Sequence, residues 1–485
     1  MGGFFICLRQ LTDGELIFGL KCNIMSDMAV KRKEKILVAM SGGVDSSVAV
    51  ALLVKAGYDV TGAFMVNYGA SSERLRPTSG ASSPQLRPTS LVDSEFTGRS
   101  SDVVGTEPCW HGDYQDALRV AAKLKIPLLR LDFVKEYQKM VLDYTFKSYS
   151  AGRTPNPDIL CNKFVKFGAW LEKAEQLGFD KLATGHYAKL ACHCEGAKQP
   201  KQSLAAVIPA KAGIQSHGKV ACKLLQSADT NKDQTYFLHQ LNQKQLSKTL
   251  FPIGNYTKHQ VRALAKKFNL PTADKAESMG ICFVGEMPMR EFLKGKVKAK
   301  PGKIISTSGE LLGEHDGLPF YTIGERVAVR FPPPARGGGE GVVGSSLSLR
   351  AKRSNLSSLS FRAKPRNPLS SDTQPLFVIG KNLKNNTIIV GTNNDPALFK
   401  KQIIITNVSW IAGQMPKLPL KCKVRLRHRQ ELQDAIISAL FKKGRAGVGS
   451  RSIVVKFTKP QRAVTPGQYA VFYLNNECLG GGEII

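Results

Sequence analysis

A short apolar run, a Ser-Gly-Gly turn and a helical pattern follow one another near residue 40, and this order constrains the fold more than any other feature. Lys35–Met40 (KILVAM) is rich in aliphatic residues and bounded by charge on its N-terminal side, which predicts a buried strand. Residues 44–56 carry apolar side chains at helical spacing and end before Gly57, so they predict a helix. With a second strand predicted over 58–66, the β–loop–α–β order is typical of an α/β fold with a parallel sheet.

Further elements extend this pattern in two ways. Residues 113–124, 126–133 and 181–184 continue the α/β pattern, and 256–268 predict a helix. Beyond residue 374 the apolar runs are short, β-rich and separated by turns, which predicts a small antiparallel barrel or sandwich. These predicted strands cover residues 376–379, 387–390, 403–408, 422–426, 453–457 and 470–474.

Four segments rich in Ser, Gly, Pro or Arg interrupt the periodic pattern, and we interpret them as surface insertions in a smaller ancestral chain. Residues 69–108 repeat Leu-Arg-Pro-Thr-Ser, and 192–222 have no clear amphipathic period. Residues 337–371 repeat Arg-Ala-Lys, and 442–452 form a shorter run. The segment 337–371 is basic enough to be an RNA-binding arm, although a solvated low-complexity loop is the commoner outcome.

The charge balance indicates a polyanionic partner. The chain has 485 residues, enough for two or three domains, and a formal net charge of +31. Such an excess attracts polyanions, and nucleic acid is the usual one. A generally basic proteome or added basic segments would produce the same excess.

Several features indicate a cytoplasmic protein without a membrane anchor. No apolar run approaches the roughly 20 residues of a membrane span. Residues 1–33, which we treat as an N-terminal extension, lack the cationic start of a signal peptide, and Met25 and Met28 are plausible alternative starts. Ten cysteines in 485 residues are too few and too scattered for a secreted disulfide framework, so free thiols are expected.

The turn after the first predicted strand has the composition of a phosphate-binding loop. In Ser41–Ser47 (SGGVDSS) two glycines let the backbone approach an anion, the serines add hydroxyl donors, and the following helix offers unpaired N–H groups. No lysine follows the glycines, so the segment is not a Walker A loop. It resembles the pyrophosphate loop of the ATP pyrophosphatase family, which cleaves ATP to AMP and pyrophosphate. The alternative is an ordinary glycine-rich turn.

A cysteine and an aspartate share the start of another predicted helix. Asn156 is a favoured cap for a helix whose first residue is Pro157. Asp158 and Cys161 then lie three residues apart on one face, and a carboxylate beside a thiol suits proton transfer coupled to sulfur chemistry. The helix N-terminus also favours thiolate. The alternative is a buried structural cysteine.

A second cysteine lies in the segment 278–286. Gly280 and Gly285 bracket a short apolar stretch that contains Cys282, which is consistent with a mobile loop presenting the thiol. In isolation this cysteine could equally belong to the core.

Taken together, these segments closely resemble the tRNA-specific 2-thiouridylase family, MnmA, from about Lys35 to Ile485 apart from the insertions. The resemblance includes the motifs ATGHY (183–187), NKDQTYFL (231–238), GEH (313–315), TPGQ (465–468) and CLGGG (478–482). It implies an N-terminal parallel-sheet ATP-binding catalytic domain over 34–235, a small central tRNA-binding domain over 236–330 that carries Cys282, and a C-terminal antiparallel β-barrel over 372–485.

The resemblance also implies a reaction, the ATP-dependent 2-thiolation of the wobble uridine (position 34) of tRNA. AMP is transferred to the uracil oxygen, and a persulfide on Cys282 attacks the activated carbon. Cys161 then forms a transient disulfide with Cys282, which releases 2-thiouridine and AMP, and Asp158 acts as acid and base. The implied partners are tRNAs for Lys, Glu and Gln and a persulfide donor such as a cysteine desulfurase or a sulfur-relay protein.

The resemblance assigns contacts residue by residue. Mg²⁺ should accompany ATP, but no protein ligand set for it is legible, and neither a protein-bound metal nor a permanent prosthetic group is expected. For His186 the alternative is a core histidine, and for Lys232 and Gln468 a turn or solvated residue. The implied ATP contacts are Ala39, Met40, Ser41, Gly42, Gly43, Val44, Asp45, Ser46, Met65 and Gly185. Asn156, Pro157 and Asp158 would face the target base, and His186, Lys232, Asp233, Gln234, Arg427, His428 and Gln468 would contact tRNA.

The sequence departs from the family pattern at one place and leaves two other functions open. Residues 321–330 have Glu325 where the family has glutamine, and the glycines that normally follow are missing, which affects part of the expected tRNA surface. The alternatives are another pyrophosphate-loop enzyme, such as a lysidine-type ligase or an amidotransferase, and a non-catalytic RNA-binding remnant. Cys192-His193-Cys194 with His217 and Cys222 offers zinc-type donors, but the C-x-C spacing is poor for structural zinc, so no zinc site is expected.

Overall fold

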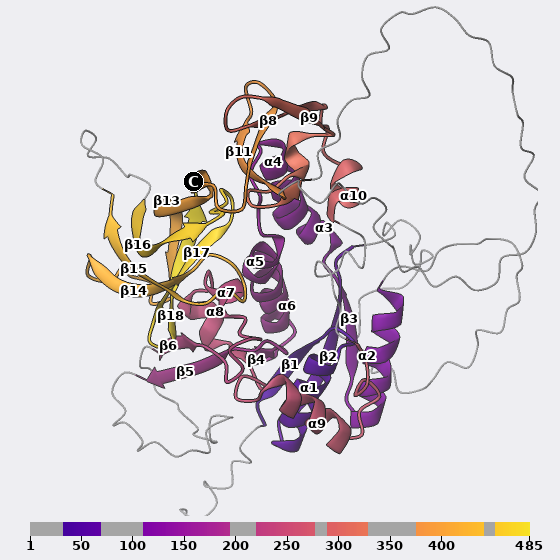
Figure 1. Ribbon diagram of the computed structural model, residues 1–485. Coiled ribbons are helices and arrows are strands. Elements are labelled where there is room, and N and C mark those ends of the chain that lie inside the picture. Colours follow the sequence, from indigo (N-terminus) through magenta and orange to yellow (C-terminus); the bar gives the residue numbers. More distant parts are fainter. Residues whose placement is uncertain (1–32, 69–109, 195–219, 277–288, 328–374, 441–451) are drawn as a thin grey trace, which may run out of the picture.

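The computed structural model describes residues 33–68, 110–194, 220–276, 289–327, 375–440 and 452–485. These segments form three sheets with helices between them (Figure 1). The N-terminal extension, most of each predicted insertion and Cys282 lie outside the described residues. None of the helices in the described segments is both long and apolar enough to cross a membrane.

The N-terminal domain is built on a five-stranded parallel sheet with the order β3-β2-β1-β4-β7. The chain adds strands on one side of β1 and then returns to add β4 on the other, so β1 and β4 form the point where the strand order reverses. Ligands of open α/β sheets bind at the carboxyl ends of such strands. The strands are β1 (Lys35–Met40), β2 (Asp59–Val66), β3 (Leu128–Asp132), β4 (Lys181–Ala183) and β7 (Thr249–Leu250).

Alternate residues of β1 face two different helical layers. Ile36 and Val38 pack against α1 and α2, whereas Leu37 joins the core formed by the helices after β3. This alternation explains the uninterrupted apolar run, because a parallel strand covered on both faces has no solvent side. The first layer contains α1 (Val44–Lys55), α2 (His111–Leu124) and α9 (Lys258–Lys267). The second contains α3 (Val134–Tyr137), the π-helix η2 (Gln138–Leu142), α4 (Asp143–Ser150), α5 (Pro157–Leu160), the π-helix η3 (Cys161–Ala169) and α6 (Trp170–Gln176).

The elements predicted around the phosphate loop are confirmed, but the first domain boundary is not where the sequence put it. β1 has the predicted bounds, α1 ends one residue early, and β2 begins one residue late. The boundary predicted at residue 235 divides the parallel sheet, because β7 pairs with β4. The helix predicted over 256–268 is α9, and it packs on α1 of the same domain.

The central domain is a small five-stranded sheet with the order β10-β11-β12-β8-β9. β11 and β12 were predicted to belong to the C-terminal barrel, and the structure corrects this, since β12 pairs in parallel with β8. The helix α10 (Met289–Lys294) joins this region to α4 through Leu293 and Tyr149. The strands are β8 (Gly302–Ser306), β9 (Leu311–His315), β10 (Arg326–Val327), β11 (Leu376–Asn382) and β12 (Thr387–Gly391), and the short 3₁₀ helix η4 is Leu318–Phe320.

The C-terminal domain is a closed six-stranded antiparallel barrel, because β18 pairs with β17 on one side and with β13 on the other. The sequence did not reveal β15 and β18. In β18 the glycines 480–482 suggest a turn, but a side chain at Gly480 would overlap the backbone oxygen of Ser409, so glycine is needed for close packing. The strands are β13 (Phe399–Trp410), β14 (Leu420–Arg425), β15 (Gln433–Ala439), β16 (Ile453–Arg462), β17 (Tyr469–Leu474) and β18 (Glu477–Ile484); the 3₁₀ helix η5 (Pro396–Leu398) precedes them.

A hairpin from the N-terminal domain extends the barrel sheet. β5 (Lys189–Cys194) pairs with β6 (Val220–Leu225), and β6 pairs with β18 at the barrel edge. Both ends of the predicted insertion 192–222 are therefore strand residues, and Cys192 forms a disulfide with Cys222 across the hairpin. α7 (Thr235–Leu238) and α8 (Gln243–Ser247) share one apolar core with β6 and the barrel.

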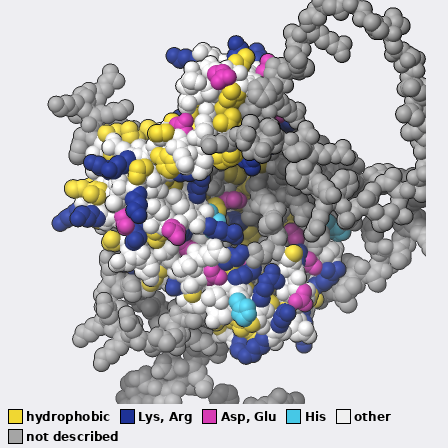
Figure 2. Space-filling view, viewed as in Figure 1, with side chains coloured by type: hydrophobic (Ala, Val, Ile, Leu, Met, Phe, Trp, Pro, Cys, Tyr) yellow, Lys and Arg dark blue, Asp and Glu magenta, His cyan; other side chains and the backbone are white. Residues whose placement is uncertain are grey.

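Basic side chains are spread over more than one domain. On the face shown in Figure 2, Lys and Arg side chains lie over the barrel and also over the N-terminal domain, rather than in a single patch. A distribution of this kind suits a polyanion long enough to touch several domains.

Candidate active site

The loop between β1 and α1 has the geometry of an anion-binding turn. Gly42 has a φ of +71°, and a side chain there would overlap the backbone oxygen of Asp113. Gly43 is the N-cap of α1 and makes no side-chain cap bond, so the first N–H groups of this 12-residue helix are open to an anion. Ser46 Oγ donates to Gly43 O (3.1 Å) and accepts from Ser41 N–H (3.3 Å), which holds the turn closed.

The segment after β4 places Gly185 against the same loop. A side chain at Gly185 would lie 2.7 Å from the backbone nitrogen of Ser46, so the chain after β4 rests directly on the start of α1. Two of the other predicted nucleotide contacts, Met40 and Met65, are almost fully buried core residues of the strands. The loop and its support therefore occupy the carboxyl ends of β1 and β4, where the strand order reverses.

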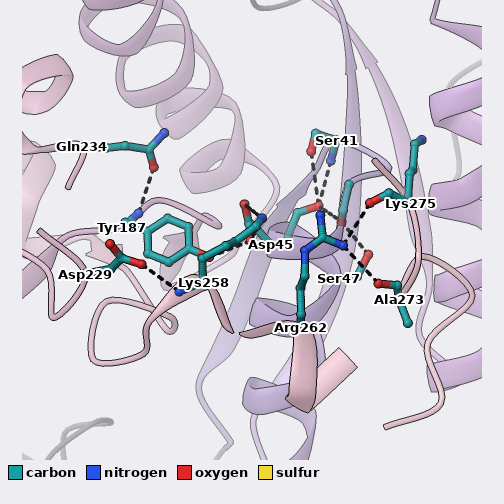
Figure 3. Close-up of polar contacts among 12 residues, drawn as sticks. Ser41, Asp45, Ser47, Tyr187, Asp229, Gln234, Lys258, Arg262, Ala273 and Lys275 are labelled. Carbon is teal, nitrogen blue, oxygen red and sulfur yellow. Dashed lines mark hydrogen bonds and ion pairs between the residues drawn. The ribbon is translucent and has the colours of Figure 1, made fainter. Parts of the chain in front are cut away.

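Two lysines from distant parts of the sequence reach this loop, and neither was predicted. Lys258, at the start of α9, places its Nζ 2.7 and 2.9 Å from the two carboxylate oxygens of Asp45, and Tyr187 donates to the same carboxylate at 2.8 Å. Figure 3 shows these side chains converging on the first turn of α1. No local motif predicts this contact, because Lys258 and Asp45 lie 213 positions apart in the sequence.

Lys275 is the second lysine, and it connects three separate groups. Its ammonium donates to Gly42 O (3.1 Å), Asp113 Oδ1 (2.7 Å) and Asp116 Oδ2 (2.6 Å). Burial alone would lower the pKa of Lys275, but the hydrogen bonds and charges of the two aspartates raise it overall. Arg262 donates to the carbonyl oxygens of Ala273 and Lys275, which fixes the backbone there.

The segment with the predicted base-facing residues forms the capped helix that the sequence indicated. Asn156 Oδ1 accepts from the N–H of Ile159 at 3.3 Å, and Pro157 is the first residue of α5. The π-helix η3 begins at Cys161, and π-helical turns are often found at functional sites. Asp158 is half-buried, whereas the side chain of Cys161 is 1% exposed and packs in the apolar core.

The barrel holds the chain immediately before this helix. Gln468 Nε2 donates to Thr154 O (2.8 Å) and to Pro155 O (3.2 Å), and Thr154 N–H donates to Pro466 O (3.0 Å). Gly467 has a φ of +91° and allows the two backbones to approach this closely. Gln468, predicted to contact tRNA, thus has a structural partner in the loop that leads to Asp158.

Two other predicted tRNA contacts are buried. Asp233 is 1% exposed, forms an ion pair with Arg425 at 2.9 Å and accepts from Thr235. His186 is buried between Phe167 and Phe251, and burial lowers its pKa well below the ordinary value, so its ring is neutral. In this structure His186 is a core histidine, which was the alternative left open for it.

The remaining predicted tRNA contacts lie nearer the surface. Lys232 is half-buried, and Gln234 accepts from the N–H of Tyr187. Arg427 is exposed and donates to Ala463 O. His428 packs against Phe237 with 4.6 Å between ring centroids. Burial, and after it the charges of nearby arginines, lowers the pKa of His428 to about 4.

The cysteines of the described segments carry no metal site. Cys192 and Cys222 are bonded to each other, and the described residues hold no group of three or more donors that could bind a metal. Cys161, Cys422 and Cys478 are buried. Burial raises the pKa of Cys422 to about 12, which keeps it an inert thiol.

Comparison with known proteins assigns a family to all three domains. The family model described as the tRNA methyl transferase HUP domain matches residues 34–92 and 93–286. The tRNA methyl transferase PRC-barrel domain matches 290–335, and the aminomethyltransferase beta-barrel domain matches 400–484. Proteins named tRNA-specific 2-thiouridylase MnmA from Bacillus cytotoxicus, Bacillus thuringiensis strain Al Hakam and Bacillus anthracis are each 36% identical over 452 residues, which is 93% of this chain and 94% of theirs.

Proposed function

Because this chain belongs to the tRNA-specific 2-thiouridylase family, MnmA, we propose that it is an ATP-dependent sulfurtransferase that converts the wobble uridine of tRNA to 2-thiouridine. The observation that carries the proposal is the position of Cys161. It lies in the same core cluster as Leu37 and Met65 of the strands beneath the phosphate loop. This shared core supports a single site for a nucleotide on that loop and a base beside Asp158.

The first step activates the uracil oxygen. The O2 atom attacks the α-phosphorus of ATP, a new P–O bond forms, and pyrophosphate leaves. The open N-terminus of α1 and the close backbone at Gly42 and Gly185 suit the phosphates. Mg²⁺ would be held mainly by phosphate oxygens and water, because the Asp45 carboxylate is already occupied by Lys258 and Tyr187.

The second step transfers sulfur. A persulfide on Cys282 attacks C2 of the adenylated base, a C–S bond forms, and AMP leaves. The Cys161 thiolate then attacks the γ-sulfur of Cys282, so the base keeps one sulfur and a Cys161–Cys282 disulfide forms. Two external thiols, or one dithiol, must supply two electrons to reduce this disulfide before the next cycle, and they leave as a disulfide. Asp158, half-buried at the start of α5, is the acid–base candidate.

Covalent geometry supports a meeting of the two thiols. Cys282 is seven residues from Lys275 and seven from Met289. Seven extended residues span at most about 25 Å, so Cys282 is tethered between the phosphate loop and α10. Met289 and Phe292 of α10 pack on the core cluster that contains Cys161.

The partners follow from the same reaction. The RNA substrate would be the tRNAs for Lys, Glu and Gln, and a cysteine desulfurase or a sulfur-relay protein would load Cys282. The reaction would take place in the cytoplasm. His186 and Asp233 would act on tRNA through the fold, because both side chains are buried.

Substitution of the cysteines tests the proposal. Purified Cys282→Ser and Cys161→Ser variants are incubated with ATP, tRNA and a persulfide source, and 2-thiouridine is measured by mass spectrometry of the digested RNA. Both variants should bind ATP and form no 2-thiouridine. Cys422→Ser is the matched control, because Cys422 is a buried thiol in the barrel core.

Three results would contradict the proposal. Continued thiolation by Cys282→Ser would remove the donor assignment. A lysyl or amido product would indicate one of the other pyrophosphate-loop enzymes. Failure of the wild-type chain to restore 2-thiouridine in a thiolase-deficient strain would favour a non-catalytic remnant.

A further inference from the structure

A cavity of about 340 Å³ lies where three domains meet. None of the residues assigned above to ATP, the target base or tRNA lines it. The segment after α4 contributes Gly152 and Arg153, the central domain contributes Ile323 and Lys381, and the barrel domain contributes Lys400 and Val464. We call this cavity the junction pocket. Its wall at 151–153 is three residues from Asn156, the first of the predicted base-facing residues.

The junction pocket has an excess of positive charge. Lys381 is half-buried, and its Nζ donates to the carbonyl oxygen of Gly152 at 3.2 Å. Burial lowers the pKa of Lys381 to about 8, and Glu325 partly offsets that effect, so the side chain is mainly cationic at neutral pH. Arg153 is half-exposed and forms an ion pair with Glu483 at 3.3 Å. Within the described segments no carboxylate forms an ion pair with Lys381 or Lys400.

The rest of the lining is apolar. Ile323, Ile379, Leu398 and Val464 contribute hydrocarbon surface to the same cavity. A small inorganic anion would gain nothing from these walls, because it is fully polar. A nucleotide has both parts that the pocket offers to contact, since its phosphate is anionic and its ribose and base present apolar faces.

We propose that the junction pocket binds the nucleotide next to the target uridine, with its phosphodiester at Lys381 and its sugar and base against the apolar wall. The inference rests on the proposed function, because it takes the polyanion to be the substrate RNA. It adds a subsite that fixes the path of the RNA strand on one side of the target uridine, whose base lies beside Asp158 in the proposed function. The pocket exists only when all three domains are in contact, so it would also report their assembly.

Binding of an anticodon stem-loop RNA tests this assignment without any turnover. Lys381→Met is compared with Lys384→Met, which removes an exposed lysine from the neighbouring turn between β11 and β12. Lys381→Met should weaken RNA binding about tenfold, the scale of one charge-assisted hydrogen bond. It should also reduce the slope of log affinity against log salt by about 0.7, the value for one phosphate of a single strand. Lys384→Met should leave both quantities unchanged, and Lys381→Arg should restore them.

A chemical substitution in the RNA identifies the phosphate. Methylphosphonate linkages are placed one at a time on either side of the target uridine, and each RNA is titrated against wild-type protein and Lys381→Met. At one linkage the combined loss should equal the single loss, because both changes remove the same contact. Additive losses at every linkage, or an unchanged salt slope for Lys381→Met, would overturn the assignment.

Two further measurements separate the possible causes of failure. Competition by inorganic pyrophosphate that disappears in Lys381→Met would identify a free-anion site instead, and would also overturn the RNA assignment. The melting temperature and ATP affinity of Lys381→Met show whether the variant is folded. If Lys381→Met is not folded, RNA binding and its salt dependence are tested with Lys381→Arg. If wild-type protein binds the RNA and forms 2-thiouridine, a negative result concerns the junction pocket alone and leaves the proposed function intact.

Discussion

The two ends of the candidate site are held together by different kinds of contact. At the phosphate loop, charged side chains bridge distant segments, as Lys258 does with Asp45 and Lys275 with Asp113. At the base end, neutral hydrogen bonds from Gln468 to the backbone at 154–155 hold the chain before α5. The ionic contacts are partly exposed, whereas those backbone oxygens belong to buried residues.

The two ends of the candidate site also differ in the domains that build them. The phosphate loop and both of its lysines lie within the residues matched by one family model, so one domain can assemble the nucleotide end. The base end needs the barrel as well, because Pro466 and Gln468 come from it. We infer that ATP binding tolerates loosening of the domains, whereas base positioning does not.

The largest loss of ATP binding and thiolation should come from a change confined to the nucleotide end. Gly42→Ala would force a side chain into the backbone of Asp113 at a φ of +71°, so ATP binding and thiolation should both fall below detection. Gly112→Ala is the control, because nothing lies within 4 Å of a side chain there. Calorimetric titration with ATP checks the result, and normal ATP affinity in Gly42→Ala would disprove the close approach.

A buried ion pair between the segment before α7 and the barrel should matter for stability rather than for RNA contact. Arg425→Met leaves the Asp233 carboxylate buried without its partner, and breaking such a pair costs about 3–5 kcal/mol. Lys423→Met on the same strand removes an exposed pair with Asp434, which is worth about 1 kcal/mol or less. Chemical denaturation measures both. A small stability loss with a large RNA-binding loss in Arg425→Met would restore Asp233 as a direct tRNA contact.

A smaller effect should appear when only the neutral contacts at the base end are removed. Gln468→Ala loses two hydrogen bonds that together contribute on the order of 1–2 kcal/mol, so thiolation should slow about tenfold. ATP affinity should not change, because the phosphate loop is untouched. Gln402→Ala, at an exposed position of β13, is the control. Equal losses of ATP affinity and thiolation in Gln468→Ala would mean that the two ends are not separable.

Acid should lower the free energy of unfolding, and this is the smallest of the expected effects. Burial lowers the pKa of His239, which packs on Tyr469 of the barrel, to about 4 from an ordinary 6.5. The unfolded chain therefore binds more protons than the folded one between these values. The stability contributed by the neutral ring is present above pH 6.5 and is lost as pH falls towards 4, on the order of 1 kcal/mol between pH 7 and 5.5.

Substitution of His239 checks the sign of this effect. His239→Gln should reduce the dependence of the unfolding free energy on pH in that window, whereas His259→Gln, at an exposed position of α9, should leave it unchanged. The dependence that remains comes from His186 and His428, because burial lowers the pKa of both rings as well. A wild-type protein that gains stability on acidification from pH 7 to 5.5 would contradict the assignment of a neutral buried ring.

Local signals were sufficient for the parts of the site that one short segment specifies. The strand, the glycine turn and the helix around residue 43 were predicted because each depends on neighbours in sequence. The cap of α5 by Asn156 was predicted for the same reason. A cap and a phosphate turn are set within four or five residues, so their residue types are informative without tertiary knowledge.

The parts that were missed depend on contacts across long sequence distances. Lys275 reaches Gly42 from 233 residues away, and nothing in its local sequence distinguishes it from a solvated lysine. The burial of His186 and Asp233 is likewise fixed by neighbours from other elements. β18 was missed because its glycines suggest a turn when their tertiary neighbours are unknown. Cys282 lies outside the described residues, so its meeting with Cys161 stays a prediction.

The strand β18 also has a consequence for how fast the native state is reached. It aligns with β6 so that Lys223 donates to Glu477, 254 residues along the chain. Contacts of such high sequence separation bring together ends whose loop-closure entropy is lost before any stabilisation is gained, and chains that depend on them fold slowly. Until β18 arrives, the edges of β13, β17 and β6 are unpaired, and exposed edges invite association between chains. Completion of this one strand is therefore the step at which folding competes with aggregation.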